Sequence, residues 1–199
     1  MTRRKLAPLL VLLCFVAPGC RTAATVDEVR ERLSPGSILL PVPNVPDEEN
    51  GSCGLDCVIS LLRFHGLELD DEGRRRFPLA EVQKEWISAG ELRDYLVVRG
   101  FRAHLVHGTF DSSQPAGILH LLRCGLPVIV EREIDGSNHF NLVCGFEPEK
   151  RWVFVMAPEG VGVISYDRFE KSWARVDRLM LAAAPAARIV PVESAADAR

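Results

Sequence analysis

The chain has 199 residues, a formal net charge of −3, and hydrophobic and charged fractions of 47% and 26%. This length and these fractions are typical of a globular protein with one compact core. The slightly acidic balance argues against nucleic acid as a main partner, because nucleic-acid binding calls for a basic face. Composition therefore favours one folded domain without a nucleic-acid function.

The first residues form a targeting segment. Residues 2–5 are polar and basic, and residues 6–16 are apolar but too short to remain as a membrane-spanning helix. The run ends in Ala17-Pro18-Gly19-Cys20, which resembles the lipobox of bacterial lipoproteins. That resemblance implies that residues 1–19 are a signal peptide and that Cys20 is acylated as the new N-terminus. An ordinary secretory signal, cleaved at a nearby small residue, is the alternative.

A lipoprotein leader also predicts where the protein resides. An acyl chain would tether the domain to one membrane leaflet without a spanning helix. Arg21 follows Cys20, and by analogy with lipoproteins there is no aspartate here to act as an inner-membrane retention signal. We therefore expect an exported lipoprotein on the cell membrane, or on the outer membrane facing the periplasm. The rest of the chain divides into a tether (20–37), a domain (38–184) and a flexible tail (185–199).

A cysteine opens the most strongly patterned helix. Cys53-Gly54 begins an apolar-periodic segment that ends at His65-Gly66. Its apolar residues cover more than half of the circumference, which predicts a buried central helix. The helix dipole and the unpaired amides at its N-terminus favour the thiolate, the nucleophilic form of cysteine. Cys53 is therefore a candidate nucleophile.

The order of the other elements indicates the fold class. Ser88 and Glu91 form a capping-box pattern that starts a helix ending at Arg99-Gly100. From Leu126 the pattern changes to strands. Helices followed by antiparallel strands predict an α+β fold, with a central N-terminal helix and further helices packed on a C-terminal antiparallel sheet. The expected helices span 26–33, 53–65, 88–99, 114–124 and 166–173, and the expected strands span 38–43, 101–106, 127–131, 139–146, 152–156, 161–165 and 178–184.

The remaining cysteines suggest packing rather than metal binding. Cys57, Cys124 and Cys144 lie within apolar segments, so we expect them as small core residues, although an exported protein is free to form disulfides. Cys53 and Cys57 stand one helical turn apart, which is poor geometry for a bridge. With no second paired set this spacing is a weak zinc signal, so no metal and no cofactor is predicted. A metal or redox role for Cys53, Cys57 and His139 is the least favoured alternative.

His139 is the candidate base. Of the five histidines, those at positions 65, 104, 107 and 120 lie within or beside predicted elements and are expected to be surface or structural residues. His139 follows a turn and opens an apolar strand, so its ring can lie at a sheet edge and face a helix N-terminus. A thiol at a helix start that faces an imidazole at a strand start is the arrangement of a nucleophile–base pair.

These features occur in an order that resembles a known family. Cys53-Gly54, opening a helix that ends at Phe64-His65-Gly66, is similar to the nucleophile helix of the bacteriocin-processing, double-glycine-type cysteine peptidases, which are papain-like. The likeness runs from about Val42 to Leu181. It implies a papain-like fold with Cys53 as nucleophile and His139 as general base. The segments that continue the likeness are 87–92 and 99–103 (second helix and following strand), 125–130 (central strand), 139–145 (histidine strand) and 169–173 (late helix).

Two positions depart from that family's pattern. Where the family has an Asp-Pro that orients the imidazole, this chain has Ala157-Pro158, and Glu159 is the nearest carboxylate and the candidate substitute. Where the family has a glutamine before the cysteine, this chain has residues 47–52. In that loop Asn50 is the candidate oxyanion donor beside the Cys53 amide. Acidic residues there would raise the pKa of Cys53.

Two functions are therefore weighed first. One is a membrane-anchored cysteine peptidase that hydrolyses peptide bonds of a peptide or protein substrate through Cys53 and His139. The other is a domain of the same fold that has lost cleavage and binds a peptide or protein partner, which the missing aspartate and glutamine motivate. No phosphate-binding glycine loop occurs in the sequence, so no nucleotide is expected.

Overall fold

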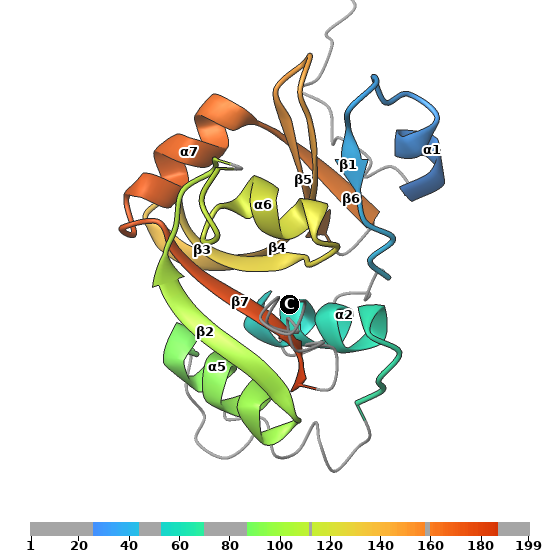
Figure 1. The fold of residues 1–199 in the computed structure, drawn as a ribbon. Helices are drawn as coiled ribbons and strands as arrows, with labels where there is room; N and C mark the ends of the chain where they lie inside the picture. Colours follow the sequence, from blue (N-terminus) through green and yellow to red (C-terminus); the bar gives the residue numbers. More distant parts are fainter. Residues whose placement is uncertain (1–25, 44–52, 70–86, 112, 158–159, 187–199) are drawn as a thin grey trace, which may run out of the picture.

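The computed structural model describes residues 26–43, 53–69, 87–111, 113–157 and 160–186 (Figure 1). The leader, the predicted acylation site Cys20, the residues after 186, and the candidate residues Asn50 and Glu159 lie outside these ranges. Within the described ranges, no helix has the length and apolarity needed to cross a membrane.

A seven-stranded sheet forms the centre of the fold, and its strands pair antiparallel. The order is β2-β7-β3-β4-β5-β6, and β1 pairs with β4. The α+β architecture predicted from the sequence is therefore the one observed. The strands are β1 (Ile38–Leu39), β2 (Phe101–His107), β3 (Val128–Ile134), β4 (Ser137–Glu147), β5 (Trp152–Ala157), β6 (Gly160–Ser165) and β7 (Leu179–Pro185).

Five helices are described alongside the sheet. The predicted capping box is present at the start of α5: the Glu91 amide donates to Ser88 Oγ at 3.3 Å, and the Ser88 amide donates to Glu91 Oε2 at 2.9 Å. These bonds satisfy amides that the first helical turn leaves unpaired. The helices are α1 (Val26–Arg30), α2 (Cys53–Phe64), α5 (Ala89–Val98), α6 (Ile118–Arg123) and α7 (Tyr166–Ala174).

Helix α6 begins four residues later than the expected start at Gln114. The chain first closes a turn in which the Gly117 amide donates to the Gln114 carbonyl at 2.8 Å, and the Ile118 amide then donates to the Thr109 carbonyl at 2.9 Å. A Cβ atom at Gly117 would overlap the Asp111 carbonyl oxygen. This close approach ties the segment to the preceding loop, so the helix starts only after the glycine.

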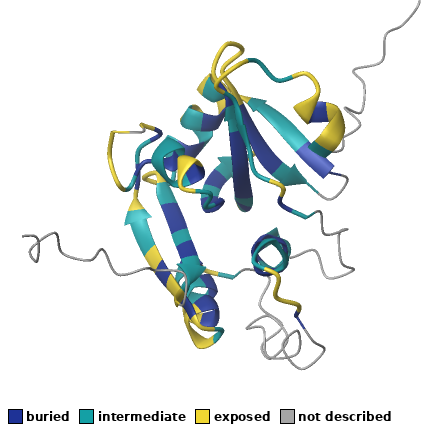
Figure 2. Ribbon diagram, turned by 45° about the vertical axis from the view of Figure 1, so that its right-hand side comes forward, coloured by how far each residue is buried: buried dark blue, intermediate teal, exposed yellow. Residues whose placement is uncertain are grey.

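The sheet separates two hydrophobic cores. Phe140, Leu142 and Cys144 of β4 belong to the core that contains the buried residues of α2 and α5. Val143, on the opposite face of the same strand, belongs to the core that contains the buried residues of α6 and α7. Alternation of side chains along each strand produces this division, and buried residues accordingly line the strands in Figure 2. Helices therefore cover both faces of the sheet.

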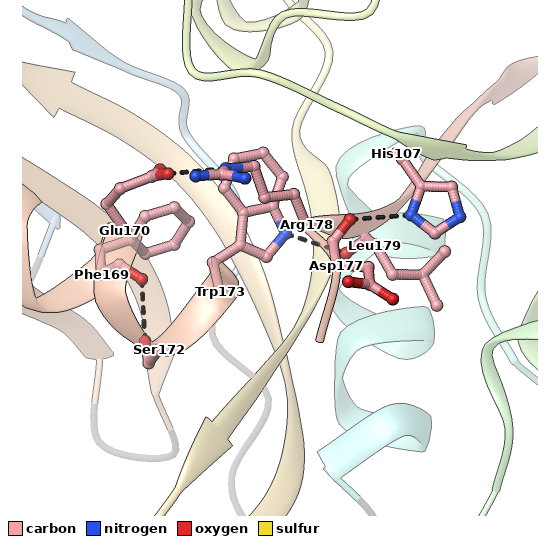
Figure 3. A network of polar contacts seen from close by, with 8 residues as sticks. All are labelled: His107, Phe169, Glu170, Ser172, Trp173, Asp177, Arg178 and Leu179. Carbon is pink, nitrogen blue, oxygen red and sulfur yellow. Dashed lines mark hydrogen bonds and ion pairs between the residues drawn. The ribbon is translucent and has the colours of Figure 1, made fainter. Parts of the chain in front are cut away.

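The turn from α7 into β7 is held by a polar network around Trp173 (Figure 3). The Trp173 ring is fully buried, and its Nε1 donates to the Leu179 carbonyl at 3.0 Å. His107 Nδ1 donates to the Asp177 carbonyl at 2.8 Å, and Arg178 Nε donates to Glu170 Oε1 at 2.7 Å. The bonds of Trp173 and Glu170 attach α7 to the start of β7, which lies beside β3 in the sheet, and the bond of His107 attaches the turn to β2.

Candidate active site

Cys53 is the first residue of α2, and the structure brings it to the start of β4. The backbone amide of Phe140 donates to Cys53 Sγ at 3.3 Å. Phe140 directly follows His139, so the thiol and the predicted base lie on elements that meet at this point, but no hydrogen bond joins the two side chains within the described residues. Helix α2 also packs along β4, and the contact is therefore part of the main packing of the domain.

A second thiol of α2 faces the same strand one turn further along. The backbone amide of Leu142 acts on the buried thiol of Cys57 and lowers its pKa, although burial raises that pKa more strongly. One helical turn of four residues rises about 6 Å, and two strand residues span about 6.6 Å. The two cysteines of α2 therefore match alternate amides of β4. The described residues contain no group of three or more His, Cys, Asp or Glu side chains that could hold a metal ion.

Gly54 allows the helix to lie this close to the strand. A Cβ atom built at Gly54 would lie 2.7 Å from Ile87 Cγ2 and 3.3 Å from Phe140 Cδ2. The first of these distances is shorter than real carbon–carbon contacts allow. A side chain at Gly54 would therefore force the Ile87 side chain to move and would crowd the Phe140 ring, so glycine suits the close packing of α2 at this point.

The local environment makes the Cys53 thiol a weak acid. Burial raises the pKa of Cys53, and the negative charge of Asp56 adds to the increase. The backbone amides of Phe140, Gly54 and Cys53 oppose it but do not cancel it. The amides at the helix N-terminus lower the pKa, as expected, but desolvation outweighs them, so the net change is an increase. The predicted increase from acidic neighbours has the observed direction, but Asp56 supplies it, and residues 47–50 lie outside the described ranges.

His139 shares one face of the sheet with Arg132 and Asn141. The β3–β4 register pairs His139 with Arg132, and Asn141 follows His139 by two residues on the same strand, so all three side chains lie on one face. Asn141 Oδ1 is buried and has no hydrogen-bond partner. The His139 ring likewise makes no hydrogen bond within the described part of the chain. Sequence analysis did not identify Asn141 or Arg132; a polar residue on the buried face of an apolar strand was the available signal.

The position expected to orient the imidazole carries no acceptor side chain. Ala157 is the last residue of β5 and is half-buried, and its methyl group cannot accept a hydrogen bond. The candidate substitute Glu159 and the candidate oxyanion donor Asn50 lie outside the described residues, and their roles stay predictions. Phe140, Gly54 and Cys53 amides are thus the described donors around the sulfur.

The other cysteines and histidines are not part of this site. Cys57 and Cys144 are buried and free, as expected for core residues, and burial raises the pKa of Cys144 to about 12. The same expectation for Cys124 was wrong: its thiol is free and exposed, and Sγ lies 3.7 Å from Nε2 of His120. Cys124 caps the C-terminus of α6, where the chain turns outward, while Leu122 takes the buried position.

Comparison with known proteins supports the architecture. No protein-family model matches the sequence, and no match was found among curated proteins. Among solved structures, the fold is similar to a double glycine motif protease from an AMS/PCAT transporter in complex with its leader peptide. The TM-score is 0.58, the identity 18%, and the alignment covers 77% of this chain and 96% of that one.

A second solved structure gives the same result. It is the peptidase domain of Streptococcus ComA, a bifunctional ABC transporter involved in a quorum-sensing pathway, with a TM-score of 0.54 and 14% identity. The alignment covers 72% of this chain and 98% of that domain. The chain therefore has the α+β, papain-like fold of double-glycine peptidase domains.

Proposed function

We propose that the protein is a cysteine peptidase that uses Cys53 as nucleophile and His139 as general base. The observation that carries this proposal is the hydrogen bond from the Phe140 amide to Cys53 Sγ at 3.3 Å. It holds the thiol beside the residue that follows His139. A thiol at a helix start and an imidazole on an adjoining strand are the groups with which a cysteine–histidine pair activates sulfur for attack on a carbonyl. The fold supports the proposal, since both similar solved domains are described as peptidases or proteases.

The reaction follows from the chemistry of the two groups. The imidazole of His139 takes the proton of the Cys53 thiol, and the sulfur attacks the carbonyl carbon of the peptide bond. Backbone amides at the start of α2 stabilise the negative oxygen of the tetrahedral intermediate, with Asn50 as a further candidate donor. The imidazolium then gives its proton to the leaving amine. Water hydrolyses the resulting thioester and restores the thiol.

We further propose Asn141 as a positioning residue for His139. Residues two apart on a strand have Cα atoms about 6.6 Å apart on one face, which is within reach of two polar side chains. A buried acceptor without a donor costs about 1–3 kcal/mol, and an imidazole N–H is the donor that Asn141 Oδ1 lacks. Closure of the site on a peptide would bring the two together, since catalytic hydrogen bonds often tighten only in the complex. Asn141 and Glu159 are alternative substitutes for the missing aspartate.

A peptide is the substrate class that fits best, because one of the similar solved domains binds a leader peptide. The lipobox-like residues Ala17 to Cys20 support attachment to a membrane, so the proposed setting is an exported lipoprotein. Acylation at Cys20 predicts that the mature N-terminal peptide carries the added mass of lipid and that Cys20→Ala removes it. Mass spectrometry of that peptide from the native cell measures this. An unmodified Cys20 in the mature protein would contradict the lipid anchor.

The decisive experiment compares the wild type with Cys53→Ala on a panel of peptides. We expect the substitution to abolish cleavage, with a fall of about 10³-fold or more. A thiol-directed probe at neutral pH should label Cys53, with the modified cysteine located by peptide mapping. Cys124→Ala is the matched control, because it removes an exposed thiol at the end of α6 and should leave cleavage unchanged. Equal cleavage by the wild type and Cys53→Ala would rule out the proposed nucleophile.

A domain that binds peptides without cleaving them is the second candidate. Two observations favour it: the raised pKa of Cys53 and the methyl group of Ala157 at the expected aspartate position. This candidate predicts peptide binding that Cys53→Ala preserves and no turnover by the wild type. Turnover that depends on Cys53 would exclude it.

A further inference from the structure

Arg132 is a buried cation without a partner. It lies on β3, its side chain is only 5% exposed, and it faces the core between the sheet and α7. Its Nε and Nη1 atoms are fully enclosed and have no hydrogen-bond acceptor. No ion pair or hydrogen bond to this side chain occurs in the described part of the chain. An uncompensated buried charge is strongly unfavourable, so this arginine calls for an explanation.

The neighbouring charges do not compensate Arg132. Glu133 pairs with Arg175 at 2.6 Å, and Glu170 pairs with Arg178 at 2.7 Å. The charged group that acts on Arg132 is another cation, Arg168, and together with burial it lowers the pKa of Arg132 to about 10. The guanidinium is therefore still protonated at neutral pH, with a second positive charge beside it, while Glu133 and Glu170 are paired with other arginines.

The position of Arg132 connects it with the candidate active site. Arg132 lies directly opposite His139 in the β3–β4 register. The guanidinium carbon lies 5.4 Å from the centre of the Phe169 ring, a cation–π contact that holds the plane of the group in place. Two of the three guanidinium nitrogens, Nε and Nη1, are enclosed and unpaired, and Nη2 is not among these enclosed atoms. The group is thus fixed in orientation, next to the proposed base, and open at one nitrogen.

We propose that Arg132 binds a carboxylate of the peptide held at the candidate active site. The one accessible nitrogen, Nη2, can donate a charge-assisted hydrogen bond to a carboxylate, and such bonds are about twice as strong as neutral ones. Such a ligand would offset the positive charge of Arg132 and of the neighbouring Arg168. The inference deepens the proposed function, on which it rests, by assigning an acidic class of peptide. The carboxylate comes from an acidic side chain or from the peptide C-terminus.

The first measurement is the thermal stability of Arg132→Met without ligand. Methionine keeps the length of the side chain and removes the unpaired charge, so the midpoint should rise by about 2–6 °C. Arg102→Met is the matched control, because Arg102 is an exposed arginine of β2 and its replacement should leave the midpoint nearly unchanged. A fall in the midpoint for Arg132→Met would show a structural role and would overturn the proposal.

The second measurement is the binding of three acetylated tripeptides to the full chain carrying Cys53→Ala, which prevents turnover. Gly-Glu-Gly amide carries only a side-chain carboxylate, Gly-Gln-Gly acid only a terminal carboxylate, and Gly-Gln-Gly amide neither. We expect one of the two carboxylate peptides to bind at least about 10-fold more tightly than the neutral one at equal ionic strength, which identifies the source. Adding Arg132→Met should abolish this preference, and adding Arg102→Met should retain it.

The outcomes separate this inference from the proposed function. Equal affinity for all three peptides, or a preference that survives Arg132→Met, overturns the carboxylate site. Neither of the two measurements requires cleavage. A wild type that cleaves no peptide but shows the Arg132-dependent preference would therefore refute the peptidase and keep the carboxylate site. Cleavage without the Arg132-dependent preference would support the peptidase and refute the carboxylate site.

Discussion

Replacing Trp173 with alanine is expected to lower the free energy of unfolding by about 3–5 kcal/mol, the range for large aromatic residues removed from a core. Trp173 is fully buried on α7 and packs against Phe169 with ring centroids 5.6 Å apart. Its Nε1 also donates to the Leu179 carbonyl at the start of β7. The variant therefore loses a large side chain and leaves a buried carbonyl without its donor.

Two further variants separate these effects in the same denaturant titration. Trp173→Phe keeps most of the packing but loses the bond to Leu179, so we expect a loss of about 1–2 kcal/mol. Trp152→Ala is the matched control, because Trp152 is an exposed tryptophan on β5 and its loss should be below about 1 kcal/mol. Equal losses for Trp173→Ala and Trp152→Ala would contradict the role of the α7–β7 junction.

Local patterns predicted the elements that position the thiol. The capping box at Ser88 and Glu91 identified the start of α5, and the apolar period after Cys53 identified α2, because both signals depend only on neighbours within a few residues. Strand alternation likewise located most of the sheet. These signals depend only on residues within a single helix or strand, so they can be read from the sequence without knowing the fold.

Local patterns did not predict how segments distant in the sequence pack against one another. Arg132 lay just outside the expected strand 127–131, and the sequence does not reveal that β3 continues to Ile134 or that α7 covers this face. The raised pKa of Cys53 depends on how deeply α2 settles against β4, which no local signal reports. Cys124 stood in an apolar run, yet the turn after α6 exposes it. In each case the missing quantity was burial by a distant segment.

In the His139→Ala variant, alkylation of Cys53 by iodoacetamide at pH 7 is expected to fall at least about 10-fold, and peptide cleavage about 10³-fold. Only the thiolate reacts, and burial raises the pKa of Cys53 above its ordinary value. Without a base, the rate should therefore rise only in the alkaline range, as for an isolated buried thiol. With His139 present, a second component should appear near neutral pH. Identical pH profiles for both proteins would exclude the pair.

If Asn141 positions the imidazole of His139, replacing Asn141 should change the rate of Cys53 alkylation near neutral pH. Asn141→Leu removes a buried acceptor that has no donor, so the folded protein should be equally stable or more stable, while alkylation at pH 7 falls about 10-fold. A purely structural asparagine would give the opposite combination, with lower stability and an unchanged profile. Asn141→Asp should restore the rate, because a carboxylate beside the ring favours the imidazolium.

Asn138→Ala is the control for these substitutions. Asn138 donates from Nδ2 to Glu131 Oε1 at 2.8 Å and lies on the opposite face of β4 from Asn141, so its loss should leave the pH profile of Cys53 unchanged. Peptide mapping reads Cys53 apart from the exposed Cys124. A neutral component that depends on His139 and Asn141 but not on Asn138 would show that β4 supplies both the base and its orienting group. The alanine at position 157 would then cost the site no function.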